Sequence, residues 1–250
     1  MLSIAIVCLV VLGVGALLLW LPTLMRNADG KLKASGTFLV KKIVIKGNRR
    51  CLRSEIIKAL GLDSRQLIFS FSLTRARDRI KALPFVKNAR LYRRLPDQLL
   101  IDIEERQPIA LFYLEKLYMV DAEGIVIGRV PSGESLDFPV ISGVSVSEWR
   151  SRPQVWNKLL KKATSLLKLW NERGHKWPEK IAQVELDEAC GVTLYTTGCG
   201  WELQLGLEDY RERLSRWRQV VNVLGEKAAS VKYFDCAGES SVVAGLQQAQ

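Results

Sequence analysis

Hydrophobic and polar positions divide the chain into one long uncharged run followed by a series of short periodic segments. The run from Leu2 to Met25 contains no charged residue and is long enough to cross a bilayer as a single helix. We predict a transmembrane anchor over 1–25 rather than a cleavable signal peptide, because no Lys or Arg precedes the run. The polar segment 26–37 holds two glycines and is predicted to be a linker.

A basic strand is predicted directly after this linker. In the stretch FLVKKIVIKGN, Phe38 to Asn48, apolar residues alternate with a period of two, which is typical of a strand. The alternation slips by one position at Lys41-Lys42. A bulge or bend at that point would return the apolar side chains to one face.

The residues that follow this strand predict a small α+β domain over 38–106. Ser54 is expected to cap a first helix that ends at Gly61, where glycine accepts left-handed backbone. The remaining elements are predicted to be a helix at 73–83 and strands at 86–94 and 99–104. Two helices would then cover one face of a three-stranded sheet in the order β-α-α-β-β.

The second half of the chain predicts a β-rich domain over 107–245 with two packed helices. Apolar residues recur at helical spacing over 153–173 and 208–224, and tryptophans on these faces are expected in the core. Short strands are expected at 117–127 (a hairpin), 138–141, 181–186, 192–195, 201–205, 231–234 and 240–244. The tail 246–250 is expected to fray. The predicted fold class is α+β with a single N-terminal transmembrane helix.

Charge is concentrated in the first domain. Residues 38–106 contain 17 Lys and Arg against 7 Asp and Glu, whereas the net charge of the whole chain is +11. Such a surface is compatible with anionic lipid, an acidic partner or nucleic acid. Aromatic residues for base stacking are sparse and no nucleic-acid-binding motif is present, so nucleic acid is the least favoured of the three.

Side chains for catalysis are missing from the pattern. The single histidine, His175, lies at the polar exit of a predicted helix, and no nucleophile elbow or phosphate-binding loop occurs. The cysteines have no metal-binding spacing. Cys190 and Cys199 flank a predicted hairpin, but their spacing favours free thiols over a disulfide. We therefore predict no enzyme, no cofactor, no metal and no small-molecule substrate.

Several segments resemble the FtsQ/DivIB family of bacterial division proteins. The opening strand ending in Gly47-Asn48 is similar to the start of a POTRA domain, and the junction Glu105-Arg106-x-Pro108-x-Ala110 is close to the family's junction motif. The hairpin LYMVDAEGIVI and the segment LQLGLEDYRERLSRW are also similar to the family. The similarity extends from the anchor to about Gly245.

This resemblance implies a non-enzymatic scaffold at the division septum. The family is anchored in the inner membrane with its bulk outside the cytoplasm, and its last strand pairs with an FtsB-type protein that associates with FtsL. The corresponding edge-strand residues here are Ser240, Ser241, Val242, Val243, Ala244 and Gly245. The family's tyrosine before this strand corresponds to Gly238, so this sequence lacks that side-chain anchor.

The basic residues of the first domain are candidates for contact with other division proteins or with lipid. They are Lys41, Lys42, Lys46, Arg90 and Arg94. The alternative function is a POTRA-type chaperone or translocation accessory that holds exported polypeptides at its sheet edge. A third hypothesis is a cytoplasmic nucleic-acid binder. The basic residues that follow the anchor would, by the positive-inside rule alone, keep the large domain in the cytoplasm. That rule is weak for a long following domain.

Overall fold

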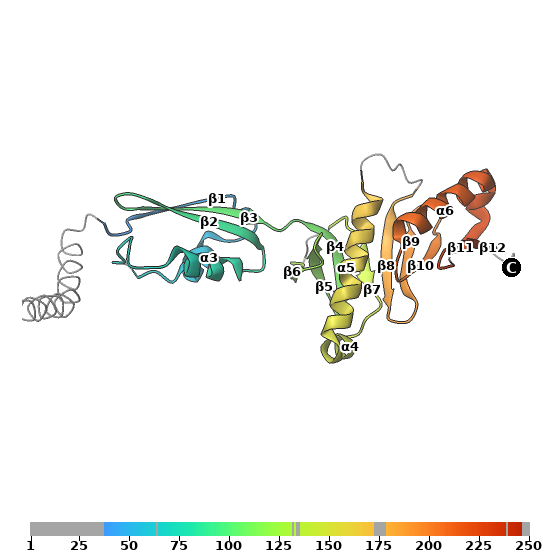
Figure 1. Cartoon of the computed structure of the whole chain (residues 1–250), viewed down its shortest axis with the longest axis horizontal. Coiled ribbons are helices and arrows are strands. Elements are labelled where there is room, and N and C mark those ends of the chain that lie inside the picture. The colour runs from blue at the N-terminus through green and yellow to red at the C-terminus, as the bar shows by residue number, and fades with distance from the viewer. Residues whose placement is uncertain are drawn as a thin grey trace, which may run out of the picture. The chain divides into compact units, whose positions relative to one another are not determined.

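The computed structural model describes residues 38–246 apart from 64, 132, 134–135, 173–178 and 239. The chain divides into two compact units, Met1–Glu105 and Arg106–Gln250 (Figure 1). No helix in the described part is long and apolar enough to span a membrane. The predicted anchor and linker, and His175, lie outside the described residues.

The first unit has the predicted order β-α-α-β-β. Its elements are β1 Lys42–Lys46, α2 Arg53–Leu60, α3 Leu73–Lys81, β2 Val86–Arg94 and β3 Gln98–Glu105. Strand β3 lies in the centre of the sheet, parallel to β1 and antiparallel to β2. The two helices pack on one face of this sheet (Figure 1). Their shared core includes Ile56, Leu60, Ala76, Ile80, Leu99 and Ile101.

The first strand is shorter than predicted, because its pairing partner changes at the expected slip. Upstream of the slip, Leu39 bridges to Leu67 and the Val40 N–H donates to the Gln66 carbonyl at 3.0 Å. The Lys41 and Lys42 N–H groups then share one acceptor, the Asp97 carbonyl, at 2.9 and 3.3 Å. Pairing with β3 begins only at Lys42. The broken alternation therefore marks a change from a loop partner to a strand partner.

Helix α2 begins differently from the prediction. Its N-cap is Leu52, so Ser54 lies inside the helix and does not cap it. The Glu55 carboxylate instead accepts a hydrogen bond from the Leu52 N–H at 3.0 Å, which satisfies one free donor of the first turn. The predicted end at Gly61 is confirmed, with φ 57° and ψ 43°.

The second unit contains a nine-stranded sheet. Its elements are β4 Pro108–Leu114, β5 Lys116–Asp121, β6 Val126–Arg129, β7 Val140–Ser142, α4 Val146–Ser151, α5 Pro153–Trp170, β8 Ile181–Asp187, β9 Gly191–Thr196, β10 Glu202–Gly206, α6 Tyr210–Leu224, the 3-10 helix η1 Gly225–Ser230, β11 Val231–Asp235 and β12 Val243–Leu246. The strand order is β12-β11-β10-β9-β8-β7-β4-β5-β6. The mixed sheet with two packed helices matches the expected architecture.

Three elements of this unit were not predicted, and the last strand was misplaced. Strand β4 was missed because its sequence, PIALFYL, is a continuous apolar run without alternation; it lies inside the sheet, between β5 and β7. The short helices α4 and η1 were also missed. Strand β12 begins at Val243, and Leu246 pairs with Val231, so this residue is not frayed.

Aromatic side chains form the centre of the second core, as predicted for Trp156, Trp170 and Trp217. The Trp217 ring lies 5.7 Å from both Trp170 and Trp201, measured between ring centroids. Phe234 of β11 makes an edge contact with Trp201 at 5.7 Å. Such contacts join α5 and α6 to the strands on which the end of the sheet depends.

Glu105 ends the first unit with a carboxylate that accepts backbone hydrogen bonds. Its Oε1 atom accepts from the N–H groups of Arg49, Arg50 and Cys51 at 2.7, 2.9 and 2.8 Å. The residue is largely buried. An anion in this position satisfies the free donors of the loop after β1 and fixes that loop to the end of β3.

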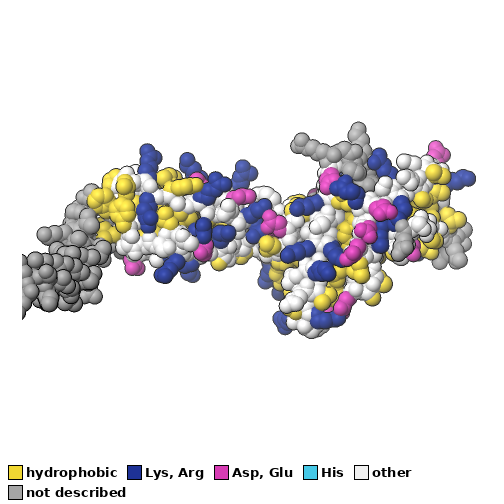
Figure 2. Space-filling model, in the orientation of Figure 1, with side chains coloured by type: hydrophobic (Ala, Val, Ile, Leu, Met, Phe, Trp, Pro, Cys, Tyr) yellow, Lys and Arg dark blue, Asp and Glu magenta, His cyan; other side chains and the backbone are white. Residues whose placement is uncertain are grey.

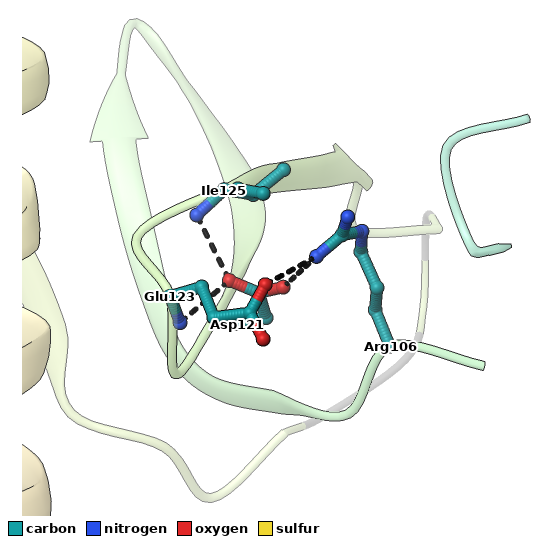
Figure 3. Close-up of polar contacts among 4 residues, drawn as sticks. All are labelled: Arg106, Asp121, Glu123 and Ile125. Atoms are coloured by element: carbon teal, nitrogen blue, oxygen red, sulfur yellow. Dashed lines mark hydrogen bonds and ion pairs between the residues drawn. The ribbon is translucent and has the colours of Figure 1, made fainter. Parts of the chain in front are cut away.

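Arg106 begins the second unit with an ion pair of its own (Figure 3). Its Nη1 atom contacts Asp121 at 2.5 Å and Glu123 at 3.2 Å. The buried Asp121 carboxylate also accepts from the Glu123 and Ile125 N–H groups, both at 2.9 Å. Burial alone would lower the pKa of Arg106, but the hydrogen bonds with Asp121 and Glu123 outweigh this effect and raise it. These contacts fix the β5–β6 turn to Arg106, the first residue of the second unit.

Glu105→Gln is expected to destabilise the first unit by about 2 kcal/mol, because an amide removes the charge and cannot satisfy three donors equally. The neighbouring Glu104→Gln, on the exposed face of the same strand, is the matched control and should change stability by less than about 0.5 kcal/mol. Hydrogen–deuterium exchange of peptides from each unit during a urea titration measures both values. Equal effects of the two substitutions would show that Glu105 does not hold the loop.

Candidate partner-binding surfaces

The last strand of the chain lies at one edge of the nine-stranded sheet. Strand β12 pairs antiparallel with β11, in a register that includes Asp235 opposite Val243 and Tyr233 opposite Gly245. No described strand pairs with its other side. One row of backbone donors and acceptors is therefore free to pair with an incoming strand.

The six residues predicted for this site divide into two groups. Ser240 and Ser241 are exposed and precede the strand, while Val242 is half-buried and packs against the core. The other three, Val243, Ala244 and Gly245, belong to β12. The strand itself therefore covers only the second half of the predicted segment.

The alternation of backbone directions indicates which residue of β12 has its N–H and C=O on the open side, and this residue is Ala244. The Cys236 N–H donates to the Gln204 carbonyl at 2.9 Å, so the Cys236 backbone faces β10. Because backbone groups alternate in direction along a strand, Asp235 and Tyr233 face β12. Their register partners on β12 then face β11, and the N–H and C=O of Ala244 between them point away from the sheet.

Side chains beside this edge are unusually apolar for an exposed strand. Val243 is 55% exposed and Leu246 is 71% exposed. The Tyr233 ring lies over Gly245, where an added Cβ would stand 2.0 Å from the ring. Glycine is thus required at this position for the ring to cover the backbone. The edge offers both main-chain groups and apolar side chains to a partner.

Two arginines of α6 donate hydrogen bonds to backbone carbonyls of β10 and of the β11–β12 connection. Arg213 donates to the Leu205 carbonyl at the end of β10 at 2.5 Å. Arg216 donates to the Gly238 carbonyl in the β11–β12 connection at 2.9 Å. Sequence periodicity did not reveal these roles, because the guanidinium groups reach past the apolar face of their own helix.

Gly238, which the resemblance aligned with a tyrosine of the FtsQ/DivIB family, therefore contributes a carbonyl to this contact. A Cβ at this residue would lie 3.2 Å from the Ser241 hydroxyl oxygen, which is tight. The turn therefore leaves little room for a side chain at Gly238. Any aromatic anchor for a partner must come from elsewhere on the edge, and Tyr233 is the exposed aromatic residue of the adjacent strand.

Cys236, directly after β11, is fully buried. Burial raises its pKa to about 12, with a further rise from the Asp235 charge, while Arg216 and Arg213 oppose the shift. Cys51 in the first unit is also buried, whereas Cys190 and Cys199 are exposed; all four thiols are free. The preference for free thiols over a disulfide is confirmed.

The second predicted surface is the open face of the first unit's sheet. Cross-strand register places Lys42 and Arg94 on either side of Gln98, and Lys46 and Arg90 on either side of Asp102. All four cations are exposed. Lys41 lies just before β1 and is also exposed. Two cations thus flank a neutral amide and two flank a carboxylate.

An apolar row separates these two pairs of cations. Val44, Leu100 and Tyr92 are register neighbours across β1, β3 and β2. Tyr92 is exposed, and the other two are half-buried. Lys and Arg side chains project around hydrophobic surface on this unit (Figure 2). The face combines charge with apolar area, which suits a partner or a lipid surface better than a small anion.

Arg216→Gln is expected to speed hydrogen exchange in residues 237–246 by about tenfold, since a charge-assisted hydrogen bond to the turn is lost. Arg211→Gln on the same helix removes only an exposed ion pair with Glu172 and is the control. The measurement is hydrogen–deuterium exchange of the C-terminal peptides. Indistinguishable exchange in the two variants would mean that Arg216 does not support the edge strand.

Two family models match the chain in the order of its two units. A POTRA domain of FtsQ type matches residues 38–106, and the C-terminal domain of cell division protein FtsQ/DivIB matches residues 112–236. The second match ends just after β11, before the β12 strand.

Curated relatives agree with these matches. Cell division protein FtsQ of Syntrophotalea carbinolica is 34% identical over 208 residues, which cover 83% of this chain and 74% of the relative. FtsQ of Geotalea daltonii is 29% identical over 198 residues, covering 79% and 72%. FtsQ of an Anaeromyxobacter species is 35% identical over 148 residues, covering 58% and 50%. The chain belongs to the FtsQ/DivIB family of cell division proteins.

Proposed function

We propose that this protein is a membrane-anchored, non-enzymatic scaffold of the division apparatus that captures a partner through the open edge of β12. The partner is an FtsB-type protein, which brings an FtsL-type protein with it. The single observation that carries the proposal is an edge strand whose outer side pairs with no described strand and carries exposed apolar side chains, in a chain of the FtsQ/DivIB family.

Strand addition supplies the physical mode of capture. An extended partner segment pairs with the outward backbone groups at Ala244 and continues the sheet by one strand. Val243 and Leu246 provide apolar contacts beside it. Main-chain pairing tolerates the absence of the family's tyrosine at Gly238, because the ladder bonds do not depend on that side chain.

The remaining features fit a scaffold outside the cytoplasm. The uncharged run over 1–25 would anchor the chain in the inner membrane, and both units would lie on the extracytoplasmic side at the septum. The open face of the first unit would meet other division proteins. The chaperone alternative is less favoured, because both family models are specific to FtsQ.

Ala244→Pro is expected to weaken capture of an FtsB-type protein at least tenfold, because proline removes the outward donor and its ring blocks the incoming strand. The β11–β12 ladder should persist, since proline is tolerated at edge positions whose N–H faces solvent. Affinity is measured by titrating the full-length chain in detergent with the purified partner.

Ala244→Ser keeps the donor and is the matched control; it should bind as the unaltered chain does. The melting temperature of each variant shows whether the second unit is intact. Unchanged affinity of a folded Ala244→Pro variant would rule out strand addition at β12. A loss of affinity in both variants would point to a side-chain contact instead.

A further inference from the structure

Exposed apolar side chains gather at one end of the first unit. Phe69 in the loop before α3 is 57% exposed, and Leu95 in the β2–β3 turn is 56% exposed. This loop and this turn lie at the same end of the unit, where the described chain begins at Phe38 (Figure 1). Hydrophobic surface is visible there in the space-filling view (Figure 2). These side chains have no role in the strand-capture site on the second unit.

The loop that presents Phe69 is held firmly. The Ile68 N–H donates to the Phe38 carbonyl at 2.9 Å, and the Phe38 and Phe69 rings lie 5.8 Å apart. Arg93 donates to the Ile68 and Phe71 carbonyls, both at 2.6 Å, and its guanidinium lies 5.9 Å from the Phe69 ring centroid. The exposed ring is therefore part of an ordered surface.

Three cations surround this apolar end. Lys41 and Lys42 are tied to the β2–β3 turn through the Asp97 carbonyl, and Arg94 directly precedes Leu95. Within the described residues, none of these three side chains forms an ion pair. At the opposite end of the sheet, Lys46 and Arg90 are the register neighbours of Asp102.

Chain length limits how far this end can lie from a membrane. Twelve residues, 26–37, separate the uncharged run from Phe38. Fully extended, they reach at most about 40 Å. The end that carries the exposed apolar and basic side chains is therefore the end tethered nearest to the bilayer surface.

We propose that this end of the first unit docks on the anionic lipid surface of the membrane that holds the anchor. Phe69 and Leu95 enter the boundary between headgroups and acyl chains, and Lys41, Lys42 and Arg94 contact lipid phosphates. A turn and a loop at the tip of a sheet fit a flat surface better than they enclose an acidic peptide. This inference rests on the anchor in the proposed function but not on partner capture at β12.

Full-length protein in lipid nanodiscs tests the docking. We expect peptides covering 66–71 and 93–98 to exchange hydrogen about tenfold more slowly in discs containing phosphatidylglycerol than in discs of phosphatidylcholine alone. Each cation near an anionic surface changes the docked population by roughly fivefold. Protection should fall as salt is raised, because the Debye length shortens.

Matched triple variants separate this end from the opposite end of the unit. Lys41→Gln/Lys42→Gln/Arg94→Gln should lose the protection, as should Leu95→Ser. The control, Lys46→Gln/Lys81→Gln/Arg90→Gln, removes the same number of exposed charges at the other end of the unit and should keep it.

Several outcomes would overturn the docking. They are equal exchange of the unaltered chain in both lipids, equal loss in both triple variants, or protection produced by a soluble acidic peptide but not by anionic lipid. Partner binding is measured on the same discs. Retained partner binding without lipid-dependent protection would reject the docking alone, whereas a chain that does not remain with the discs would reject the anchor itself.

Discussion

The proposed capture of a partner depends on strand β12, which pairs with β11 on one side and with no described strand on the other. Strand β12 has one neighbour, β11, and its position relies on few contacts: the register with β11, the Tyr233 ring over Gly245, and the Arg216 hydrogen bond to the β11–β12 turn. Strand β11 is joined to the aromatic core by the edge contact between Phe234 and Trp201. In the proposed mode of capture, an edge held in this way would add a further strand without first rearranging, which would reduce the entropic cost of binding.

The junction between the two units is also fixed by polar contacts, and each contact stays within one unit. Adjacent residues, Glu105 and Arg106, each make buried or half-buried polar contacts inside their own unit. The first satisfies three backbone donors of the loop after β1, and the second pairs with Asp121 in the β5–β6 turn. Residue identity at the junction thus follows from local hydrogen bonding on each side. This gives a physical reason for the motif by which the sequence resembles its family.

Periodicity predicted the elements whose two faces differ in polarity. The β-α-α-β-β order, the long helix α5 and most strands of the second unit were correct for this reason. Strand β4 was missed because it lies between two neighbours in the sheet and shows no alternation. The supporting roles of Glu105, Arg213 and Arg216 could not be predicted, because they arise from contacts between residues distant in sequence. The start of β12 shifted for the same reason: pairing with β11, rather than composition, decides it.

The central claim is that a partner strand pairs with the outward backbone of Ala244. The most direct measurement is the exchange rate of the Ala244 amide, read by NMR or by fragmentation-resolved mass spectrometry, with and without a saturating FtsB-type segment. Strand addition predicts that this amide, exposed in the free protein, becomes protected by at least about a hundredfold on binding. Saturating binding that leaves the exchange of the Ala244 amide unchanged would contradict the account.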